Sequence, residues 1–190
     1  MIANSSNNLS IKEYLEIESQ TDTKYEYHNG SIYAMAGGML NHGLICGNIF
    51  GEIRTALKHK KSNCKVLNSE IKLHIKEKNN FLYPDAMIIC GEIEQAETAS
   101  HAVTNPVVII EVLSKSTANY DRGDKFFFYR QIETLQEYIL IEQNKAQIEI
   151  YKKKGDLWKI TRISGIANLL SISTLDIKIK LEDIYQDIVF

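Results

Sequence analysis

The sequence lacks the long apolar segments that membrane spans and secretory leaders require. Its 190 residues contain no run of about 18 apolar residues, which excludes a membrane-spanning helix. The N-terminal residues are polar, rich in Asn and Ser, and carry no apolar signal core. We therefore expect a cytoplasmic protein whose residues 1–9 form a flexible tail.

Cysteine is scarce as well. Cys46, Cys64 and Cys90 are odd in number, widely spaced and set among apolar residues. This spacing does not provide the clustered ligands of a structural zinc site. It is typical of buried thiols, and we expect all three cysteines to be reduced.

The chain has no excess of positive charge. Its net charge is −2, so there is no global attraction to nucleic acid. Binding of DNA would need a local basic patch or metal ions. The short basic runs 58–61 and 152–154 are the only visible patches of this kind, and their alternative role is solvated surface. No repeat, linker or low-complexity stretch divides the sequence, which is 44% hydrophobic and 24% charged. One globular domain over residues 1–190 is predicted.

One charge interrupts the most apolar stretch of the chain. Glu111 lies inside the run 107–113, whose other members are Val, Ile and Leu. Such a run predicts a strand that is buried on both faces. An ionised carboxylate there costs several kcal/mol unless a cation compensates it. The alternative to a metal ion is an ion pair with Lys125 or Arg122.

A second carboxylate can reach the same place. Asp85 follows Tyr83-Pro84 and opens the apolar run 86–90. If the two runs pair antiparallel with Cys90 opposite Pro106, Asp85 falls opposite Glu111, with their Cβ atoms ~5 Å apart. Two carboxylates this close favour an oxygen-rich site for Mg²⁺ or Mn²⁺. The main-chain carbonyl of Val112 is a candidate third ligand.

Hydrophobic periodicity predicts an α+β domain. Asn29-Gly30 between alternating residues predicts a hairpin over 24–33, and apolar residues at four-residue spacing predict a helix from its N-cap Asn41 to about Lys60. The strand 71–76 is expected to turn at Asn79-Asn80 into the Asp85 strand. The other predicted elements are a helix over 11–17 capped by Ser10, a strand over 137–141, a helix over 120–132, a hairpin from 147–151 to 158–163, and a weakly alternating segment over 172–181.

Several short motifs occur in a specific order between residues 26 and 151. They are Glu26, Gly30, His42, Pro84-Asp85, Glu111 to Ser114, Ser116-Thr117, Asp121, Lys125, Tyr129 and Glu137-Tyr138. Together they resemble the PD-(D/E)XK nuclease superfamily and, more closely, the Uma-two family of restriction-endonuclease-like proteins. The resemblance implies an α+β core of a helix, a three-stranded antiparallel meander, a helix and a strand, with hairpins added at both ends. It also implies metal-dependent cleavage of phosphodiesters, with DNA as the substrate.

One position departs from the superfamily pattern. A lysine is expected two residues after Glu111, but Leu113 stands there. The closer family resemblance suggests a relocated lysine, and Lys125, on the following helix, is the best candidate. Its alternative roles are a lysine on the helix surface or a partner of Asp121, four residues earlier on the same helix face.

The resemblance assigns candidate roles to these residues. Asp85 and Glu111 would bind the metal, and Lys125 would orient or deprotonate the attacking water. Glu26 would complete the acidic shell, or belong only to the hairpin. His42 would contact a phosphate at a helix N-terminus, or serve as a cap or packing residue. Asp121 would support this shell, or act on the helix dipole.

Two functions remain open from the sequence. The first is a Mg²⁺- or Mn²⁺-dependent endonuclease acting on DNA, as a homodimer because cutting a duplex calls for two sites. The second is a nuclease-fold protein that binds nucleic acid or assembles with other proteins without turnover. Leu113 and the acidic charge balance favour the second.

Overall fold

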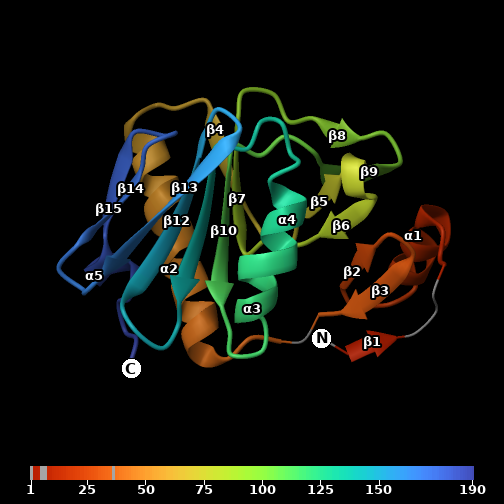
Figure 1. Cartoon of the computed structure of the whole chain (residues 1–190), viewed down its shortest axis with the longest axis horizontal. Coiled ribbons are helices and arrows are strands. Elements are labelled where there is room, and N and C mark those ends of the chain that lie inside the picture. The colour runs from red at the N-terminus through yellow and green to blue at the C-terminus, as the bar shows by residue number, and fades with distance from the viewer. Residues whose placement is uncertain (1, 5–7, 36) are drawn as a thin grey trace.

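The fold is that of a computed structural model that describes residues 2–4, 8–35 and 37–190 (Figure 1). A six-stranded sheet forms its centre, in the order β13-β12-β11-β10-β7-β4, and only β10 and β11 pair in parallel. The strands of this sheet are β4 (Cys64–Asn68), β7 (Ala86–Cys90), β10 (Val108–Leu113), β11 (Glu137–Glu142), β12 (Gln147–Lys154) and β13 (Leu157–Ser164).

The central register agrees with the one expected from the sequence. β7 and β10 pair antiparallel, with Ile88 opposite Val108 and Ala86 opposite Ile110. Continuing that register by one position places Asp85 opposite Glu111. The backbone pairing ends there, so both carboxylates lie at the end of the β7–β10 ladder.

Helices cover both faces of this sheet. The long helix α2 (Leu40–His59) lies behind the sheet in Figure 1, and the segment containing α3 (Ala118–Tyr120) and α4 (Phe126–Tyr129) lies in front. Alternate residues of β10 explain this arrangement, because successive side chains of a strand point to opposite faces. Val108, Ile110 and Val112 pack with the α2 side, whereas Ile109 and Leu113 pack with Tyr129 of α4.

The start of α2 differs from the prediction. Met39 occupies the N-cap position and makes no side-chain capping bond, whereas Asn41 was expected there. The Asn41 amide instead donates a hydrogen bond to the carbonyl of Val189 near the C-terminus. The predicted apolar stripe is confirmed, because its members are buried: Ile45, Ile49, Ile53 and Leu57.

The second main helix is interrupted. Between α3 and α4 the residues Asp121–Lys125 form a π-helical turn, and the helical segment ends at Tyr129 rather than at the expected Ile132. Single π turns inside helices are frequent at functional sites. Here the wider turn buries both of its end residues, so that Asp121 and Lys125 are 2% and 6% exposed.

A seven-stranded sheet lies beside this core, at the right of Figure 1. The predicted strand 71–76 belongs to it, so the expectation that this strand leads directly into the Asp85 strand is wrong. It turns at Asn79 into β6, and the first strand of the meander is β4. The strands of the second sheet are β1 (Ile2–Asn4), β2 (Tyr25–His28), β3 (Ser31–Ala34), β5 (Lys72–Ile75), β6 (Asn80–Leu82), β8 (Gln95–Ala96) and β9 (Ala99–Val103).

The hairpins and the first helix form as expected. α1 (Ile11–Ser19) begins with a capping box of Ser10 and Glu13. The β2–β3 turn uses Asn29 and Gly30, both at positive φ, as Asn-Gly turns require.

The flexible tail expected over 1–9 falls partly on Met1 and residues 5–7, which lie outside the described residues. The remaining elements are η1 (Lys76–Lys78), β14 (Leu169–Ile172), β15 (Ile177–Lys180) and α5 (Leu181–Ile184).

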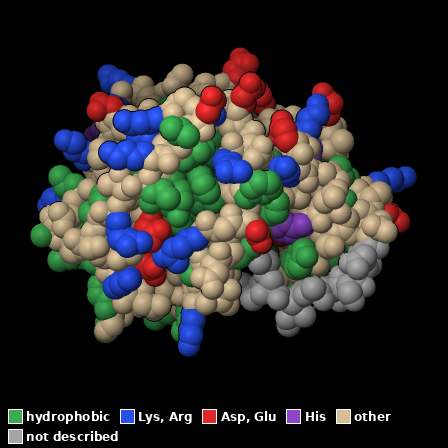
Figure 2. All heavy atoms as spheres, in the orientation of Figure 1, with side chains coloured by type: hydrophobic (Ala, Val, Ile, Leu, Met, Phe, Trp, Pro, Cys, Tyr) green, Lys and Arg blue, Asp and Glu red, His purple; other side chains and the backbone are tan. Residues whose placement is uncertain are grey.

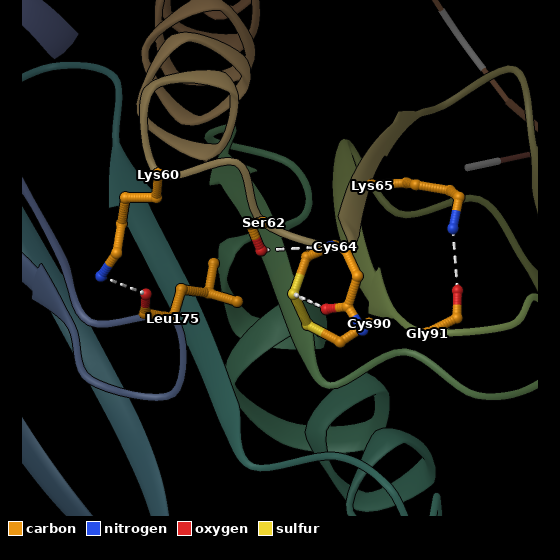
Figure 3. The surroundings of a disulfide bond; sticks show 8 residues. Lys60, Ser62, Cys64, Lys65, Cys90, Gly91 and Leu175 are labelled. Atoms are coloured by element: carbon orange, nitrogen blue, oxygen red, sulfur yellow. Dashed lines mark hydrogen bonds between the residues drawn. A yellow bond between two sulfur atoms is a disulfide. The ribbon is translucent and has the colours of Figure 1, made fainter.

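The prediction of three reduced thiols is wrong. Cys64 and Cys90 form a disulfide between β4 and β7, where the register places them directly opposite each other (Figure 3). The two residues lie far apart in the sequence, so only the strand pairing brings their sulfur atoms together. Cys46 is the remaining cysteine and is free. No helix in the described part of the chain is long and apolar enough to cross a membrane.

Candidate active site

A cavity of about 610 Å³ opens where the two sheets and α2 meet. Its wall is built from β2, the segment before α2, the first turns of α2, the end of β10 and the π-helical turn. Every site residue expected from the sequence lines this cavity: Glu26, His42, Asp85, Glu111, Val112, Asp121 and Lys125. The structure thus brings together residues that span a hundred positions of the chain.

Asp85 closes the end of the central ladder. Its Oδ2 accepts a hydrogen bond of 2.7 Å from the main-chain N–H of Val112. The N–H of Asp85 in turn lies 3.4 Å from Oε2 of Glu111. The N–H and C=O of one strand residue point to the same side. The Val112 carbonyl therefore faces the edge where β7 has ended, on the side from which His42 approaches.

Glu111 is nearly inaccessible, with 3% of its surface exposed. Its Oε1 accepts a hydrogen bond of 2.7 Å from the Tyr129 hydroxyl and lies 2.8 Å from Nζ of Lys125. These two contacts hold Oε1, while Oε2 points to Asp85. The carboxylate is therefore fixed with one oxygen toward the second acidic residue.

Lys125 lies at the centre of the acidic groups. Its Nζ is 2.8 Å from Glu111, 3.3 Å from Glu26 and 3.7 Å from Asp121. The lysine thus reaches the cluster from the helix after β10, the place from which a relocated lysine was expected to act. Arg122, the alternative partner of Glu111, instead pairs with Glu142 and Glu149. Figure 2 shows this outer face, where acidic side chains over β12 and β13 lie between basic ones.

Glu26 supplies a third buried carboxylate. It is 2% exposed, and its Oε2 lies 3.6 Å from Nε2 of His28. Its Oε1 meets no strict hydrogen-bond geometry in the described part of the chain, but it lies 3.3 Å from Nζ of Lys125 and is paired with that ammonium group. Lys125 is thus shared among Glu26, Glu111 and Asp121, and a further cation would offset the negative charge that one lysine leaves. The donor set of carboxylates and a main-chain carbonyl therefore fits Mg²⁺ or Mn²⁺.

His42 approaches the same place from α2. Its Nε2 lies 3.3 Å from Oδ2 of Asp85, and its Nδ1 lies 3.5 Å from Sγ of Cys46. The hydrogen bond to Asp85 raises the pKa of the imidazole, although burial opposes this, and a contact with the main chain of Val112 adds to it. A protonated imidazole is thus favoured at this wall of the cavity.

The cluster holds more negative than positive charge. Burial raises the pKa of the Glu111 carboxyl well above its usual range, and Asp85 adds to this effect. Burial also raises the pKa of Asp121. Burial alone would lower the pKa of Lys125, but Glu111 and Glu26 outweigh it and raise that pKa. The pKa of Glu26 is lowered in spite of burial, because Lys125 lies beside it. Lys125 therefore stays protonated, and the excess of carboxylates favours binding of a further cation.

Sequence reasoning missed two residues of this site. Tyr129 belongs to the motifs of the resemblance but was assigned no role there, although its hydroxyl donates to Glu111. Cys46 was interpreted as a buried thiol, although it lines the cavity. The spacing of the sequence gives a signal in both cases. Tyr129 lies four residues after Lys125, and Cys46 lies four residues after His42, so each shares a helix face with a residue that lines the cavity.

Comparison with known proteins identifies the family. Residues 11–182 match the Uma2 family, which is described as "Putative restriction endonuclease". An uncharacterized protein of Synechocystis sp. is 37% identical over 158 residues, 83% of this chain and 88% of that protein. A second uncharacterized protein of the same organism is 32% identical over 191 residues, 96% of this chain and 94% of that protein.

A solved structure supports the fold. The crystal structure of a "putative nuclease belonging to DUF820" from Anabaena variabilis superposes with a TM-score of 0.74. The match covers 93% of this chain and 97% of that one, at 15% sequence identity. The α+β restriction-endonuclease-like fold that the sequence predicts is therefore confirmed.

Proposed function

This chain belongs to the Uma2 family, and we propose that it is a Mg²⁺- or Mn²⁺-dependent endonuclease that hydrolyses phosphodiester bonds of DNA. One observation carries the proposal. Asp85, Glu111 and Lys125, which come from three different elements, meet in one cavity at the end of the β7–β10 ladder.

Asp85, Glu111 and the Val112 carbonyl would hold the metal. Oε1 of Glu111 is occupied by Lys125 and Tyr129, which leaves Oε2 for the ion. Bound there, Mg²⁺ or Mn²⁺ supplies a Lewis acid for the scissile phosphate and lowers the pKa of a coordinated water. Glu26, whose Oε1 is paired with Lys125 at 3.3 Å, would complete the acidic shell, directly or through water.

Lys125 would act as a charged hydrogen-bond donor rather than as a base. Its carboxylate neighbours raise its pKa, so the ammonium form predominates near neutral pH. An ammonium group can orient the attacking water and hold a nonbridging phosphate oxygen as its charge grows. Asp121, at 3.7 Å and on the same π turn, would position this lysine.

His42 would contact the phosphate from the opposite wall. It lies in the first turn of α2, where backbone N–H groups and the helix dipole favour an anion. Its raised pKa favours the imidazolium, which can donate a hydrogen bond to a phosphate oxygen.

Plasmid cleavage tests the proposal. The purified protein is incubated with supercoiled DNA and Mn²⁺, beside Asp85→Asn, Glu111→Gln and the control Glu97→Gln, which changes an exposed carboxylate. Loss of a metal ligand removes several kcal/mol of transition-state stabilisation, so the two site variants should cleave at least about 100-fold more slowly. Equal cleavage by both site variants and the control would refute the assignment. Light scattering of the same samples tests the proposed homodimer.

A second function is supported by Leu113. This residue occupies the position of the expected lysine and is packed in the core at 1% exposure. A family member that lost turnover would still bind nucleic acid or assemble with partners. Such a protein would slow the migration of DNA in a gel-shift assay with Ca²⁺ or Mn²⁺. It would produce no nicked plasmid under any condition.

A further inference from the structure

His42, Cys46 and Asp85 form a cluster of three different donor types in the same cavity. One nitrogen of His42, Sγ of Cys46 and one oxygen of Asp85 all lie within 4.8 Å of one another. His42 and Cys46 are four residues apart on α2, so they point from the same helix face. Asp85 approaches from the start of β7.

This donor set differs from that of the acidic pair. Mg²⁺ and Mn²⁺ prefer carboxylate, carbonyl and water oxygens, whereas thiolate and imidazole select Zn²⁺ and related transition metals. Three protein ligands of mixed N, S and O type, beside an open cavity, are the arrangement of a zinc ion that keeps a free coordination position. Only Asp85 belongs to both sets.

We propose that His42, Cys46 and Asp85 bind Zn²⁺ or a similar transition-metal ion at a second cation site of this cavity. Zn²⁺ takes Cys as thiolate and His as neutral imidazole, so binding releases their protons to the solvent. Burial raises the pKa of the Cys46 thiol, so the free protein carries that proton near neutral pH. Because Asp85 is shared, Zn²⁺ at this site would compete with Mg²⁺ or Mn²⁺; only this consequence rests on the proposed function.

A purely structural role for Cys46 makes different predictions. The residue is half-buried and packs against the apolar cluster between α2 and the sheet. If packing were its only role, replacing the thiol would alter stability and leave metal affinity unchanged.

Cobalt spectroscopy tests the site directly. Co²⁺ substitutes for Zn²⁺, and a thiolate ligand gives it a charge-transfer band in the near ultraviolet. Cys64 and Cys90 are joined in the disulfide, so such a band on the unreduced full-length protein can come from Cys46 alone. The band should appear on titration with Co²⁺ and disappear when Zn²⁺ is added. Bound Co²⁺ without this band in the wild-type protein would overturn the proposal.

Calorimetric titration with Zn²⁺ measures how much Cys46 contributes to the affinity for the ion. Removing a partner of a metal ligand typically costs 10- to 100-fold in affinity, so Cys46→Ser, which loses a direct ligand, should cost at least about tenfold. Glu111→Gln is the matched control, because it removes a carboxylate of the acidic pair and leaves the three donors in place. It should change Zn²⁺ affinity less than Cys46→Ser does. Equal Zn²⁺ affinity of Cys46→Ser and the wild type would overturn the proposal.

The two proposals can fail separately. A protein that cleaves no plasmid but gives the cobalt–thiolate band keeps the zinc site and loses the nuclease assignment. A protein that cleaves plasmid with Mn²⁺ but binds Co²⁺ without the band loses only the zinc site.

Discussion

The replacement Lys125→Met should expose how much the buried lysine stabilises the carboxylates around it. Its ammonium group lies within 4 Å of Glu111, Glu26 and Asp121, and all four side chains are nearly inaccessible. Methionine keeps an unbranched chain of similar length, so the change removes the charge with little change in packing. The remaining carboxylates then have no lysine to compensate them.

The expected loss of stability can be worked out from the response of the folded variant that costs the least free energy, which is to protonate one of the carboxylates. A glutamate with an ordinary pKa of about 4.3 costs about 1.4 kcal/mol per pH unit to protonate above that value. At pH 7 this amounts to about 3.7 kcal/mol, within the 3–5 kcal/mol typical of broken buried ion pairs, and at pH 5 to about 1 kcal/mol. The free energy of unfolding should therefore fall most at neutral pH.

The sign of the pH dependence is specific. Burial already raises the pKa values of Glu111 and Asp121 in the wild type, and without the lysine these values rise further and the lowered pKa of Glu26 rises as well. The folded variant therefore binds more protons than the unfolded chain, and its stability decreases as pH rises. In the wild type the pKa of Lys125 is raised, so its contribution persists from acidic to neutral pH and is lost only at strongly alkaline pH.

Urea unfolding at pH 5 and pH 7 measures both quantities. The control Lys58→Met changes an exposed lysine of α2 and should shift the free energy of unfolding by no more than about 0.5 kcal/mol. A deficit below about 1 kcal/mol at pH 7, or an equal deficit at both pH values, would refute the ion-pair account of Lys125.

Three further predictions follow from the same contacts. Tyr129→Phe removes the hydrogen bond to Glu111, so Mn²⁺ affinity measured by calorimetry should fall about 10- to 100-fold; unchanged affinity would contradict the positioning role. Because burial raises the pKa of Glu111, protons compete with Mn²⁺, and affinity should rise from pH 5 to pH 8 rather than stay constant. Replacing Cys64 and Cys90 by serine opens a disulfide across 26 positions and should cost about 2–4 kcal/mol in thermal unfolding, with no further loss on adding reductant.

The central register could be predicted because two local signals agree on it. The apolar run before Glu111 and the run after Pro84-Asp85 have the composition of buried strands, and aligning them puts both carboxylates together. The structure has this register. Alternation along β10 also explains which residues face α2 and which face α4, a pattern readable from the sequence.

Other features depend on contacts that no local pattern contains. β4 was missed because Cys64–Asn68 is short and mixes polar with apolar residues, and its place is set by pairing with β7. The disulfide depends on that same pairing. α2 begins without a side-chain cap, and the amide of Asn41 bonds to the carbonyl of Val189, a contact that the local sequence does not contain.

The candidate site also contains residues that the sequence reveals and residues that only the structure reveals. Asp85 and Glu111 carry a charge where the surrounding sequence is apolar, and that conflict makes them visible. The chemistry of Tyr129 and Cys46 is hidden, because tyrosine and cysteine are ordinary core residues. Only the folded arrangement shows that a hydroxyl and a thiol face the carboxylates.

Anomalous diffraction from crystals soaked in Mn²⁺ tests the central claim most directly. The account predicts one strong peak in the cavity, with Oδ of Asp85, Oε2 of Glu111 and the Val112 carbonyl as its protein ligands, at about 2.0–2.3 Å. If crystals soaked at a saturating Mn²⁺ concentration show no anomalous peak between the two carboxylates, the proposed metal site is contradicted.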